Sequence, residues 1–422
     1  MLHACSRFVP QSLKNILYHF PLAVFAAVYF GFPARQLKVI GITGTNGKTT
    51  TTQFITRILQ KAGKKVAMTS TINFEIGDRK WTNVSKFTTL SSWKLQKFLR
   101  EAVRSGCEYA VLETSSHALD QYRVWGISYE IVVMTNVTHE HLDYHLTMKE
   151  YRRAKKRLFK NAQMAVVNLD MENPKEYLNA KSFTRSLSYS TKKRVADMYT
   201  EELVLDTLET SFLVQGRMFH IHLPGRYNVE NALASLAVAR LLEIDLGIAG
   251  QALDEIVGIP GRMEFISNVQ GFHILIDYAV TPDSLEKLYT LVASMRLEGA
   301  RIIAVFGSCG ERDRSKRPIM GSLVSSVADI VILTNEDPYY EDPEQILDEI
   351  EGGITGKEKG KNYWRIPDRR EAISQALKMA RSGDWIVVTG KGAEESMAIG
   401  DLRLPWNERS VIEEELRNRV QS

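Results

Sequence analysis

The sequence predicts an α/β protein with more than one domain, built on mainly parallel sheets. Short β-branched runs alternate with helix-like segments over most of the 422 residues, as expected for strands joined by crossover helices. Hydrophobic residues make up 44% of the chain and charged residues 25%, which is the composition of a folded soluble protein rather than a disordered one. The length exceeds that of one ordinary core, so we expect two or three domains.

Five apolar runs between residues 38 and about 168 predict the strands of a first sheet. They read KVIGIT, KKVAMT, YAVLET, EIVVMTN and MAVVN, and helix-like segments separate them. Over residues 182–223, shorter pieces such as LETSFLVQ and RMFHIHL predict an antiparallel flap on the same domain. A helix is expected to follow at residues 228–242.

The turn-forming pair Pro260 and Gly261 marks a candidate hinge. Beyond it the alternation resumes with FHILID, RIIAVFG, DIVILT and DWIVVTG, which predict a second, smaller sheet. We therefore predict an N-terminal segment at residues 1–37, a central domain at 38–261 and a C-terminal domain at 262–422.

Charge and cysteine content limit the classes of function. The chain has 54 Lys and Arg against 50 Asp and Glu and no long basic run, so nucleic acid is not expected as a partner. This small excess of positive charge is compatible with anionic small molecules as ligands. Cys5, Cys107 and Cys309 lie far apart without C-x-x-C spacing, which argues against disulfides or a structural zinc site and favours the cytoplasm.

The most apolar stretch, residues 22–32, is shorter than the roughly 20 residues that cross a bilayer. We interpret it as a packed helix and expect no membrane partner. An interfacial anchor is the alternative, because His19, Phe20, Phe25 and Tyr29 could lie at a lipid surface.

The motif VIGITGTNGKTTT at residues 39–51 joins an apolar strand to a glycine-bearing turn and a helix start. Such a loop turns backbone N–H groups onto phosphate oxygens, its lysine reaches the β- and γ-phosphates, and its threonine hydroxyl holds Mg²⁺. The strict motif has glycine where this chain has Ile42. The ATP-binding candidates here are Gly44, Thr45, Asn46, Gly47, Lys48, Thr49 and Thr50. We therefore predict a P-loop ATPase-like parallel sheet in the central domain and a smaller Rossmann-like α/β fold in the C-terminal domain.

Two further candidates follow from their positions in the predicted elements. Glu113 follows the apolar strand YAVL, so its carboxylate should emerge at the ligand-binding edge of a parallel sheet, where it could bind Mg²⁺. Asn228 and Asn231 lie one helical turn apart, so their amides share a face that could read adenine; a helix cap with an ordinary polar contact is the alternative.

The form GTNGKTT is found in Mur ligases and folylpolyglutamate synthetases. The later motifs follow the order seen in UDP-N-acetylmuramoyl-tripeptide synthetases: LETSSHAL, MTNVTHEHLDYH, YRRAKKRLF, NVENALA, GIPGRMEF, DYAVTPDSL, FGSCGERDRSKRP, NEDP and GKGAE. The chain therefore resembles the Mur ligase family over nearly its whole length. The resemblance implies a monomeric cytoplasmic ligase that uses ATP and Mg²⁺ to form an amide bond through an acyl phosphate. Its implied role is to add the third residue to UDP-N-acetylmuramoyl-L-alanyl-D-glutamate in peptidoglycan synthesis.

The resemblance also assigns roles to individual residues. It makes His141 a ligand of a second metal ion and Lys155 a lysine that CO₂ carbamylates, although Lys155, Lys156 and Arg157 by themselves indicate a solvated basic face. The catalytic candidates are Lys48, Glu113, His141 and Lys155, and the metal candidates are Thr49, Glu113, His141 and Lys155 as carbamate. Arg262 should meet the ATP phosphates and Asp277 should lie near the ribose. The substrate-binding candidates are Thr88, Thr89, Ser115, Arg123, Asp337 and Glu394.

Several positions depart from the family pattern. Only 37 residues precede Lys38 in place of the domain that holds UDP, so we expect a weaker hold on a UDP-linked acceptor or a different carrier. The D-N-P-R arginine of diaminopimelate-adding enzymes is Tyr339 here, which leaves lysine or ornithine as open as diaminopimelate. A folylpolyglutamate synthetase-like or other amino-acid ligase, and a catalytically silent scaffold, remain alternatives.

Overall fold

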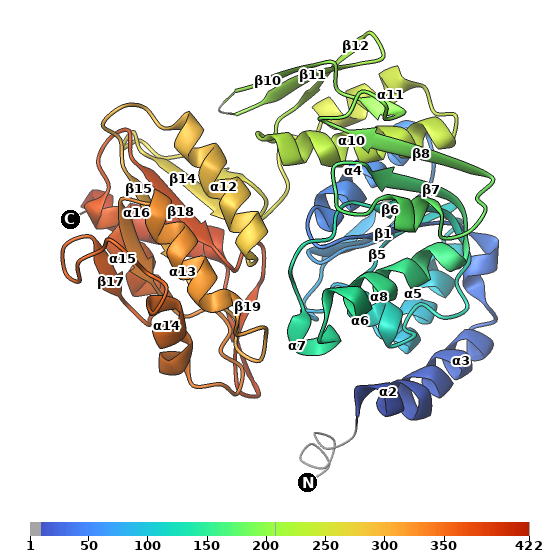
Figure 1. Cartoon of the computed structure of the whole chain (residues 1–422), viewed down its shortest axis with the longest axis horizontal. Helices are drawn as coiled ribbons and strands as arrows, with labels where there is room; N and C mark the ends of the chain where they lie inside the picture. The colour runs from blue at the N-terminus through green and yellow to red at the C-terminus, as the bar shows by residue number, and fades with distance from the viewer. Residues whose placement is uncertain (1–9, 207, 422) are drawn as a thin grey trace.

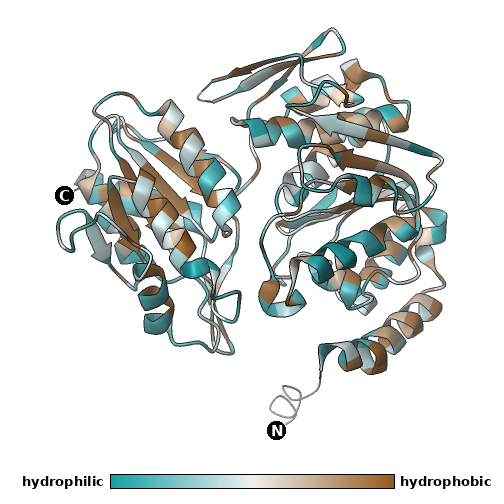
Figure 2. Ribbon diagram, viewed as in Figure 1, coloured by the Kyte–Doolittle hydropathy of each residue, from teal (hydrophilic) through white to brown (hydrophobic). Residues whose placement is uncertain are grey.

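The computed structural model describes residues 10–206 and 208–421, and their two large sheets lie in two lobes (Figure 1). One sheet has nine strands and the other six, and smaller sheets of three and two strands accompany them. The strands of both large sheets are the most hydrophobic parts of their lobes and lie between layers of helices (Figure 2). The predicted α/β class is confirmed.

The nine-stranded sheet has the order β4-β3-β2-β5-β1-β6-β7-β8-β9. The strands β2, β5, β1, β6, β7, β8 and β9 pair in parallel, and β3 and β4 form an antiparallel edge. The five runs predicted as strands are β1, β2, β5, β6 and β7, so that prediction is confirmed. The bounds are β1 (Lys38–Thr43), β2 (Val66–Thr69), β3 (Asn73–Ile76), β4 (Arg79–Thr82), β5 (Tyr109–Glu113), β6 (Tyr129–Met134), β7 (Ala162–Asn168), β8 (Arg185–Ser190) and β9 (Met198–Tyr199).

Helices cover both faces of this sheet, and alternate residues of β1 point to the two layers. Ile40 and Ile42 belong to the core under α4 (Lys48–Lys61), α10 (Arg226–Leu241) and α11 (Leu246–Asp254). Val39 belongs to the opposite core, which includes residues of α5 (Ser92–Arg104), α6 (Ser116–Asp120), α8 (Met148–Lys160) and α9 (Lys175–Leu178). Because β1 lies between β5 and β6, the carboxyl ends of these three strands meet at one edge.

The predicted flap is only half correct. The strands β10 (Glu202–Leu205), β11 (Thr210–Val214) and β12 (Arg217–Ile221) form the expected antiparallel sheet. The strands β8 and β9 instead extend the main sheet in parallel, because the crossover through α9 returns β8 alongside β7. The mixed polar pattern of β8, RSLSYS, conceals this role in the sequence.

The six-stranded sheet has the order β13-β14-β18-β15-β16-β17, antiparallel only at β13. The strands predicted from FHILID, RIIAVFG, DIVILT and DWIVVTG are β14, β15, β16 and β18. One core includes residues of α12 (Pro282–Met295), α13 (Lys316–Val327) and α14 (Pro343–Glu351), and the other residues of α15 (Arg369–Met379) and α16 (Glu408–Gln421). The bounds are β13 (Glu264–Ile266), β14 (His273–Asp277), β15 (Ile302–Phe306), β16 (Ile330–Leu333), β17 (Tyr363–Arg365), β18 (Trp385–Thr389), and the hairpin strands β19 (Ser396–Ile399) and β20 (Leu402–Pro405).

An N-terminal arm precedes β1 and runs along the lobe of the larger sheet (Figure 1). It contains α2 (Gln11–Lys14), the π-helical turn η1 (Asn15–His19), α3 (Phe20–Tyr29) and the short η2 (Pro33–Gln36). The predicted helix packs through Ala23, Ala26 and Ala27, while Phe25 and Tyr29 are exposed. Within the described part of the chain, no helix is long and apolar enough to cross a bilayer.

A buried ion pair ties the last helix to the smaller sheet. The side chains of Arg369 on α15 and Glu408 on α16 are both fully buried, and Arg369 Nε donates to the two carboxylate oxygens at 3.2 and 3.1 Å. Arg369 also donates to Thr389 O at 2.8 Å, at the end of β18. Trp406 Nε1 donates to Glu408 Oε2 at 2.6 Å. The carboxylate of Glu408 therefore joins α15, α16 and the residues just before α16.

We therefore expect Glu408→Ala to lower the free energy of unfolding by about 3–5 kcal/mol, because it leaves a buried guanidinium without its counter-charge. Urea titration followed by tryptophan fluorescence measures this change. Arg370→Ala is the matched control, since it removes the exposed pair with Glu414 and should cost less than about 1 kcal/mol. Equal effects of the two substitutions would contradict the assignment.

Candidate active site

The phosphate-binding loop lies between β1 and α4, at the edge where β1, β5 and β6 end. A Cβ on Gly44 would lie 1.8 Å from Thr135 Oγ1, so only glycine fits against the end of β6. Gly47 has a φ of +81°, and a Cβ there would lie 2.3 Å from Asn231 Oδ1. Both glycines are therefore required by close contacts, as the loop motif predicts.

Residues after β6 hold the loop in place. Thr45 N donates to Asn136 O at 2.9 Å, and Asn46 N donates to Asn136 Oδ1 at 2.9 Å. Thr135 Oγ1 donates to Asn46 O at 2.6 Å. Thr50 follows in the first turn of α4 and is buried. These bonds fix the loop backbone before any ligand binds.

Two lysine ammonium groups converge on one carbonyl oxygen of this loop. Lys48 Nζ donates to Gly44 O at 3.1 Å and to Thr45 O at 2.8 Å, and Lys155 Nζ donates to Gly44 O at 2.7 Å. Lys155 is 1% exposed, so the interpretation of a solvated basic face is wrong for it. Burial lowers the pKa of both lysines, and the charge of Lys48 lowers the pKa of Lys155 further.

The carboxylate of Glu113 faces the loop from the end of β5, as predicted. Thr49 Oγ1 donates to both carboxylate oxygens at 3.1 Å. Thr71 donates to the same carboxylate from its backbone N at 2.7 Å and from its hydroxyl at 2.9 Å. A hydroxyl and a carboxylate side by side at the phosphate loop are the hard oxygen donors that Mg²⁺ prefers, so these residues fit that ion.

His141 precedes α7 (Leu142–His145) with a φ of 59°. Its ring lies 4.6 Å from that of His117, centroid to centroid. Burial lowers the pKa of His141 well below its ordinary value, and His117 and Lys155 lower it further, so the neutral imidazole keeps a lone pair for a metal. Among the described residues no three His, Cys, Asp or Glu side chains are grouped to hold a metal ion.

A cavity of about 270 Å³ lies between the two lobes, over the phosphate loop. Asn231 Nδ2 donates to Asn228 Oδ1 at 3.3 Å and Asn231 Oδ1 accepts from Thr51 at 3.3 Å, so this pair lies against the start of α4. The predicted nucleotide residues that line the cavity are Thr45, Asn46, Gly47, Lys48, Thr49, Thr50, Asn228, Asn231, Arg262 and Asp277.

Two of these residues come from beyond the predicted hinge. Arg262 Nη2 donates to Thr49 Oγ1 at 3.3 Å, and its guanidinium carbon lies 4.5 Å from the centre of the Tyr278 ring. Asp277 Oδ2 accepts from Met263 N at 2.8 Å, and burial raises the pKa of Asp277. The described residues thus place a cation from the second lobe at the phosphate loop.

Four predicted substrate-binding residues form a continuous strip beside Glu113. Thr89 Oγ1 donates to Glu113 O at 3.0 Å and accepts from Ser115 N at 2.9 Å. Arg123 Nη1 donates to Thr89 O at 3.0 Å. Thr88 Oγ1 accepts from Thr71 Oγ1 at 3.2 Å.

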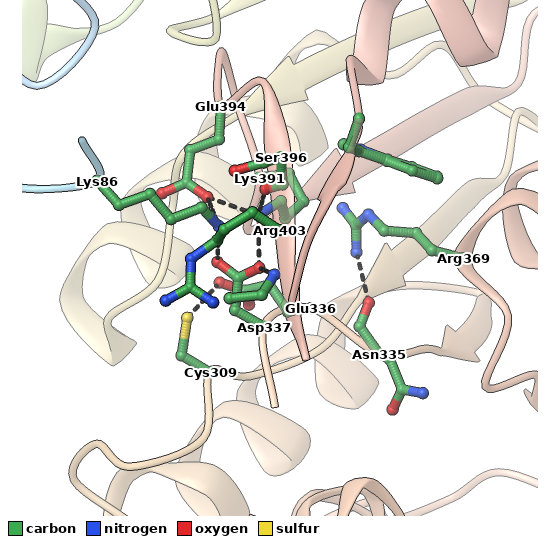
Figure 3. Close-up of polar contacts among 12 residues, drawn as sticks. Lys86, Cys309, Asn335, Glu336, Asp337, Arg369, Lys391, Glu394, Ser396 and Arg403 are labelled. Atoms are coloured by element: carbon green, nitrogen blue, oxygen red, sulfur yellow. Dashed lines mark hydrogen bonds and ion pairs between the residues drawn. The ribbon is translucent and has the colours of Figure 1, made fainter. Parts of the chain in front are cut away.

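Asp337 and Glu394, the other two substrate-binding candidates, lie in the second lobe with two lysines (Figure 3). Lys391 Nζ is 2.9 Å from Asp337 Oδ1 and 2.5 Å from Glu394 Oε2. Lys86 Nζ reaches across from the first lobe, 2.5 Å from Asp337 Oδ2 and 3.1 Å from Glu394 Oε2. Although burial raises the pKa of Asp337, Lys391 and Lys86 lower it below its usual value.

Sequence reasoning missed several residues of this site. Thr71 and Lys86 lie in polar segments without any motif, so no local pattern could have found them. Lys391 belongs to the GKGAE motif, in which only Glu394 was predicted to bind substrate. Tyr151 lies one helical turn before Lys155, its hydroxyl is 3.0 Å from Thr45 Oγ1, and its ring centre is 4.4 Å from Lys155 Nζ. Helical spacing from Lys155 could have indicated that contact.

Comparison with protein families defines the class to which this fold and site belong. The model of the Mur ligase middle domain matches residues 42–239, and that of the Mur ligase, glutamate ligase domain matches residues 261–392. The chain belongs to the Mur ligase family.

Within that family its relatives include tripeptide synthetases. A UDP-N-acetylmuramyl-tripeptide synthetase of Roseiflexus sp. (strain RS-1) is 40% identical over 409 residues, covering 92% of this chain and 80% of the relative. A UDP-N-acetylmuramoyl-L-alanyl-D-glutamate–2,6-diaminopimelate ligase of Clostridium botulinum (strain ATCC 19397 / Type A) is 38% identical over 399 residues, covering 93% and 80%.

The fold is also similar to those of solved structures. A structure of a UDP-N-acetylmuramoyl-L-alanyl-D-glutamate–2,6-diaminopimelate ligase superposes with a TM-score of 0.62 at 32% identity, covering 92% of this chain and 79% of that one. Folylpolyglutamate synthase of Mycobacterium tuberculosis, complexed with ADP and AMPPCP, gives a TM-score of 0.71 at 17% identity, covering 90% and 96%. At that identity the second likeness shows the fold alone.

Because His145 is a buried histidine near the site, we expect the stability of the protein to depend on pH. His145 is buried, its Nε2 lies 3.0 Å from Ser116 Oγ, and burial lowers its pKa to about 4. Because the folded state holds fewer protons than the unfolded state, stability should fall as pH drops from about 6.5 towards 4. His145→Gln, which keeps a hydrogen-bonding group, should flatten this slope in melting curves recorded between pH 7.5 and 5. An unchanged slope would contradict the role of His145.

Proposed function

We propose that this Mur ligase adds the third amino acid to UDP-N-acetylmuramoyl-L-alanyl-D-glutamate in peptidoglycan synthesis, with hydrolysis of ATP to ADP. One observation carries the proposal. Lys48, Thr49 and Glu113 meet at the phosphate loop, and Arg262 from the second lobe meets them there. A triphosphate in this cavity would lie between cations from both lobes. The strip of predicted substrate-binding residues lies beside Glu113, because Thr89 Oγ1 donates to its main-chain carbonyl oxygen.

The residues present suit a phosphoryl transfer followed by amide formation. The acceptor carboxylate attacks the γ-phosphorus of ATP in line and ADP leaves, which yields an acyl phosphate. Lys48 and Arg262 are placed to hold the charge that spreads over the phosphoryl oxygens. The amine of the amino acid then attacks the acyl carbon and phosphate departs.

Mg²⁺ fits the same edge of the sheet. Thr49 and Glu113 would hold one ion, which would neutralise phosphate charge. His141 and a carbamylated Lys155 are the proposed protein ligands of a second ion. Carbamylation requires a neutral amine that forms a bond to the carbon of CO₂ and releases a proton. The lowered pKa of Lys155 supports that step, since burial beside Lys48 favours the neutral amine.

For the incoming amino acid we propose the slot at Asp337 and Glu394. Two carboxylates in one slot suit the ammonium group of a side chain such as that of lysine, ornithine or diaminopimelate. Tyr339 stands where the diaminopimelate-adding enzymes have arginine, so we leave the three amino acids as candidates.

The remaining assignments are proposals of the same kind. A boundary near Gly261 is supported by its positive φ of 64° and by the family models, which end and begin on either side of residues 240–260. A cytoplasmic location is supported by the use of ATP and by the free thiols of Cys107 and Cys309; Cys5 lies outside the described residues. We also propose that the enzyme acts as a monomer and that Asn228, Asn231 and Asp277 bind the nucleoside.

Purified protein should release phosphate from ATP only when both an acceptor and an amino acid are present, with amide and ADP formed in equal amounts. Lys48→Ala should lower this turnover by on the order of a hundredfold or more, because the migrating charge loses its cation. Lys64→Ala removes an exposed lysine beside Glu108 and is the control. Equal ATP hydrolysis without either substrate would refute the ligase. Turnover with folate-type acceptors alone would favour the folylpolyglutamate synthetase alternative.

Lys155 should carry a carbamate, detectable as a ¹³C resonance after incubation with labelled bicarbonate. Lys155→Ala should be nearly inactive, and formate or acetate should restore part of the activity by replacing the lost oxygen ligands. Lys156→Ala, on the next residue of α8, should retain both the signal and the activity. An unmodified Lys155 together with normal activity of the alanine variant would exclude the carbamate.

A further inference from the structure

The N-terminal arm presents an apolar face that the central lobe does not cover. Its large residues Leu13, Leu17, Tyr18, Phe25, Val28 and Tyr29 are between 44% and 68% exposed. The opposite side of α3 packs through Ala23, Ala26 and Ala27, each at most 1% exposed. A helix on a water-exposed surface normally buries its large apolar side chains and exposes its polar ones. This arm does the reverse, so its outer face is built for a non-aqueous neighbour.

Aromatic rings extend this face onto the helix α5. Trp93 stacks on Phe25 with ring centroids 6.0 Å apart, and it lies 4.9 Å from Tyr29 and from Phe30. Lys97 follows Trp93 by one helical turn and is exposed, so it borders the same cluster. Tyrosine and tryptophan rings flanked by lysine are typical of segments at the headgroup level of a bilayer.

Positive charge predominates around this face. The sequence contains no Asp or Glu before Glu75, while Lys14, Arg35 and Lys38 lie in or next to the arm. Two acidic residues on neighbouring helices are already engaged. Glu101 forms an ion pair with Arg79 at 3.1 Å, and Asp120 forms one with Arg157 at 2.9 Å. An apolar face with a basic border complements an anionic lipid surface.

We propose that the outer face of the N-terminal arm binds the surface of an anionic membrane. The helical segment from Gln11 to Tyr29 would lie along the membrane plane, with its apolar side chains among the acyl chains and its lysines at the headgroups. The arm runs along the side of the larger lobe, away from the lobe of the smaller sheet (Figure 1). Binding there leaves the cavity between the lobes open to substrates.

The test is cosedimentation of the full chain with phosphatidylcholine vesicles and with vesicles of equal parts phosphatidylcholine and phosphatidylglycerol. We expect binding to the anionic vesicles only, and weaker binding at high salt. Phe25→Ser/Tyr29→Ser should weaken it about tenfold or more, because two large side chains no longer enter the acyl region. Lys94 is exposed on α5, next to Trp93. Lys94→Glu/Lys97→Glu should weaken binding about fivefold per charge removed.

Val257→Ser/Val269→Ser is the matched control, because these valines are 85% and 93% exposed elsewhere and their loss should leave binding unchanged. Melting curves and ATP turnover of each variant establish that its fold is intact. Absence of binding to the anionic vesicles, or equal binding by the Phe25→Ser/Tyr29→Ser variant, would overturn the proposal. So would self-association in sedimentation velocity that this variant abolishes without any vesicle binding, since the face would then join copies of the chain.

Discussion

The carbonyl oxygen of Gly44 accepts hydrogen bonds from two lysines, and the organisation of the active site depends on this arrangement. Two buried ammonium groups within reach of one oxygen repel each other and lose hydration, so burial depresses the pKa of both. The negative charge of a bound polyphosphate would stabilise the ammonium group of Lys48. The proposed conversion of Lys155 to a carbamate would remove this repulsion from the other side, because an anion would replace a cation. The electrostatics of the two lysines therefore support both the proposed anionic ligand and the proposed carbamate.

The sheet topology is what brings the two lysines together. Lys48 begins α4, which packs on one face of the nine-stranded sheet, and Lys155 lies on α8, which packs on the other. The loop carrying Gly44 lies at the edge where β1 and β6 end, so helices on either face can reach it there. A side chain at the centre of α8 can thus reach the phosphate loop while its neighbours Lys156 and Arg157 remain partly exposed.

The sequence predicted the elements better than it predicted the contacts between them. Apolar runs such as KVIGIT identified the strands because each is buried on both faces, and Glu113 was placed correctly because strand ends of a parallel sheet share an edge. The sequence did not identify β8 as a strand of the main sheet, because only alternate residues of this strand are apolar. The contacts of Lys86 were not predicted for a different reason. Its partners Asp337 and Glu394 are 251 and 308 residues away, and no local period encodes such a pair.

Lys86 also constrains how an amino acid can enter the proposed slot. Asp337 and Glu394 contribute two negative charges, and Lys391 and Lys86 already balance them. The side chain of Lys391 is fully buried, whereas that of Lys86 is 11% exposed and comes from the other lobe. A cationic substrate would therefore displace Lys86 at a lower cost than Lys391, because Lys86 regains water more readily. Under the proposed function, occupation of the slot breaks a contact between the lobes, so amino-acid binding and the position of the two lobes are energetically linked.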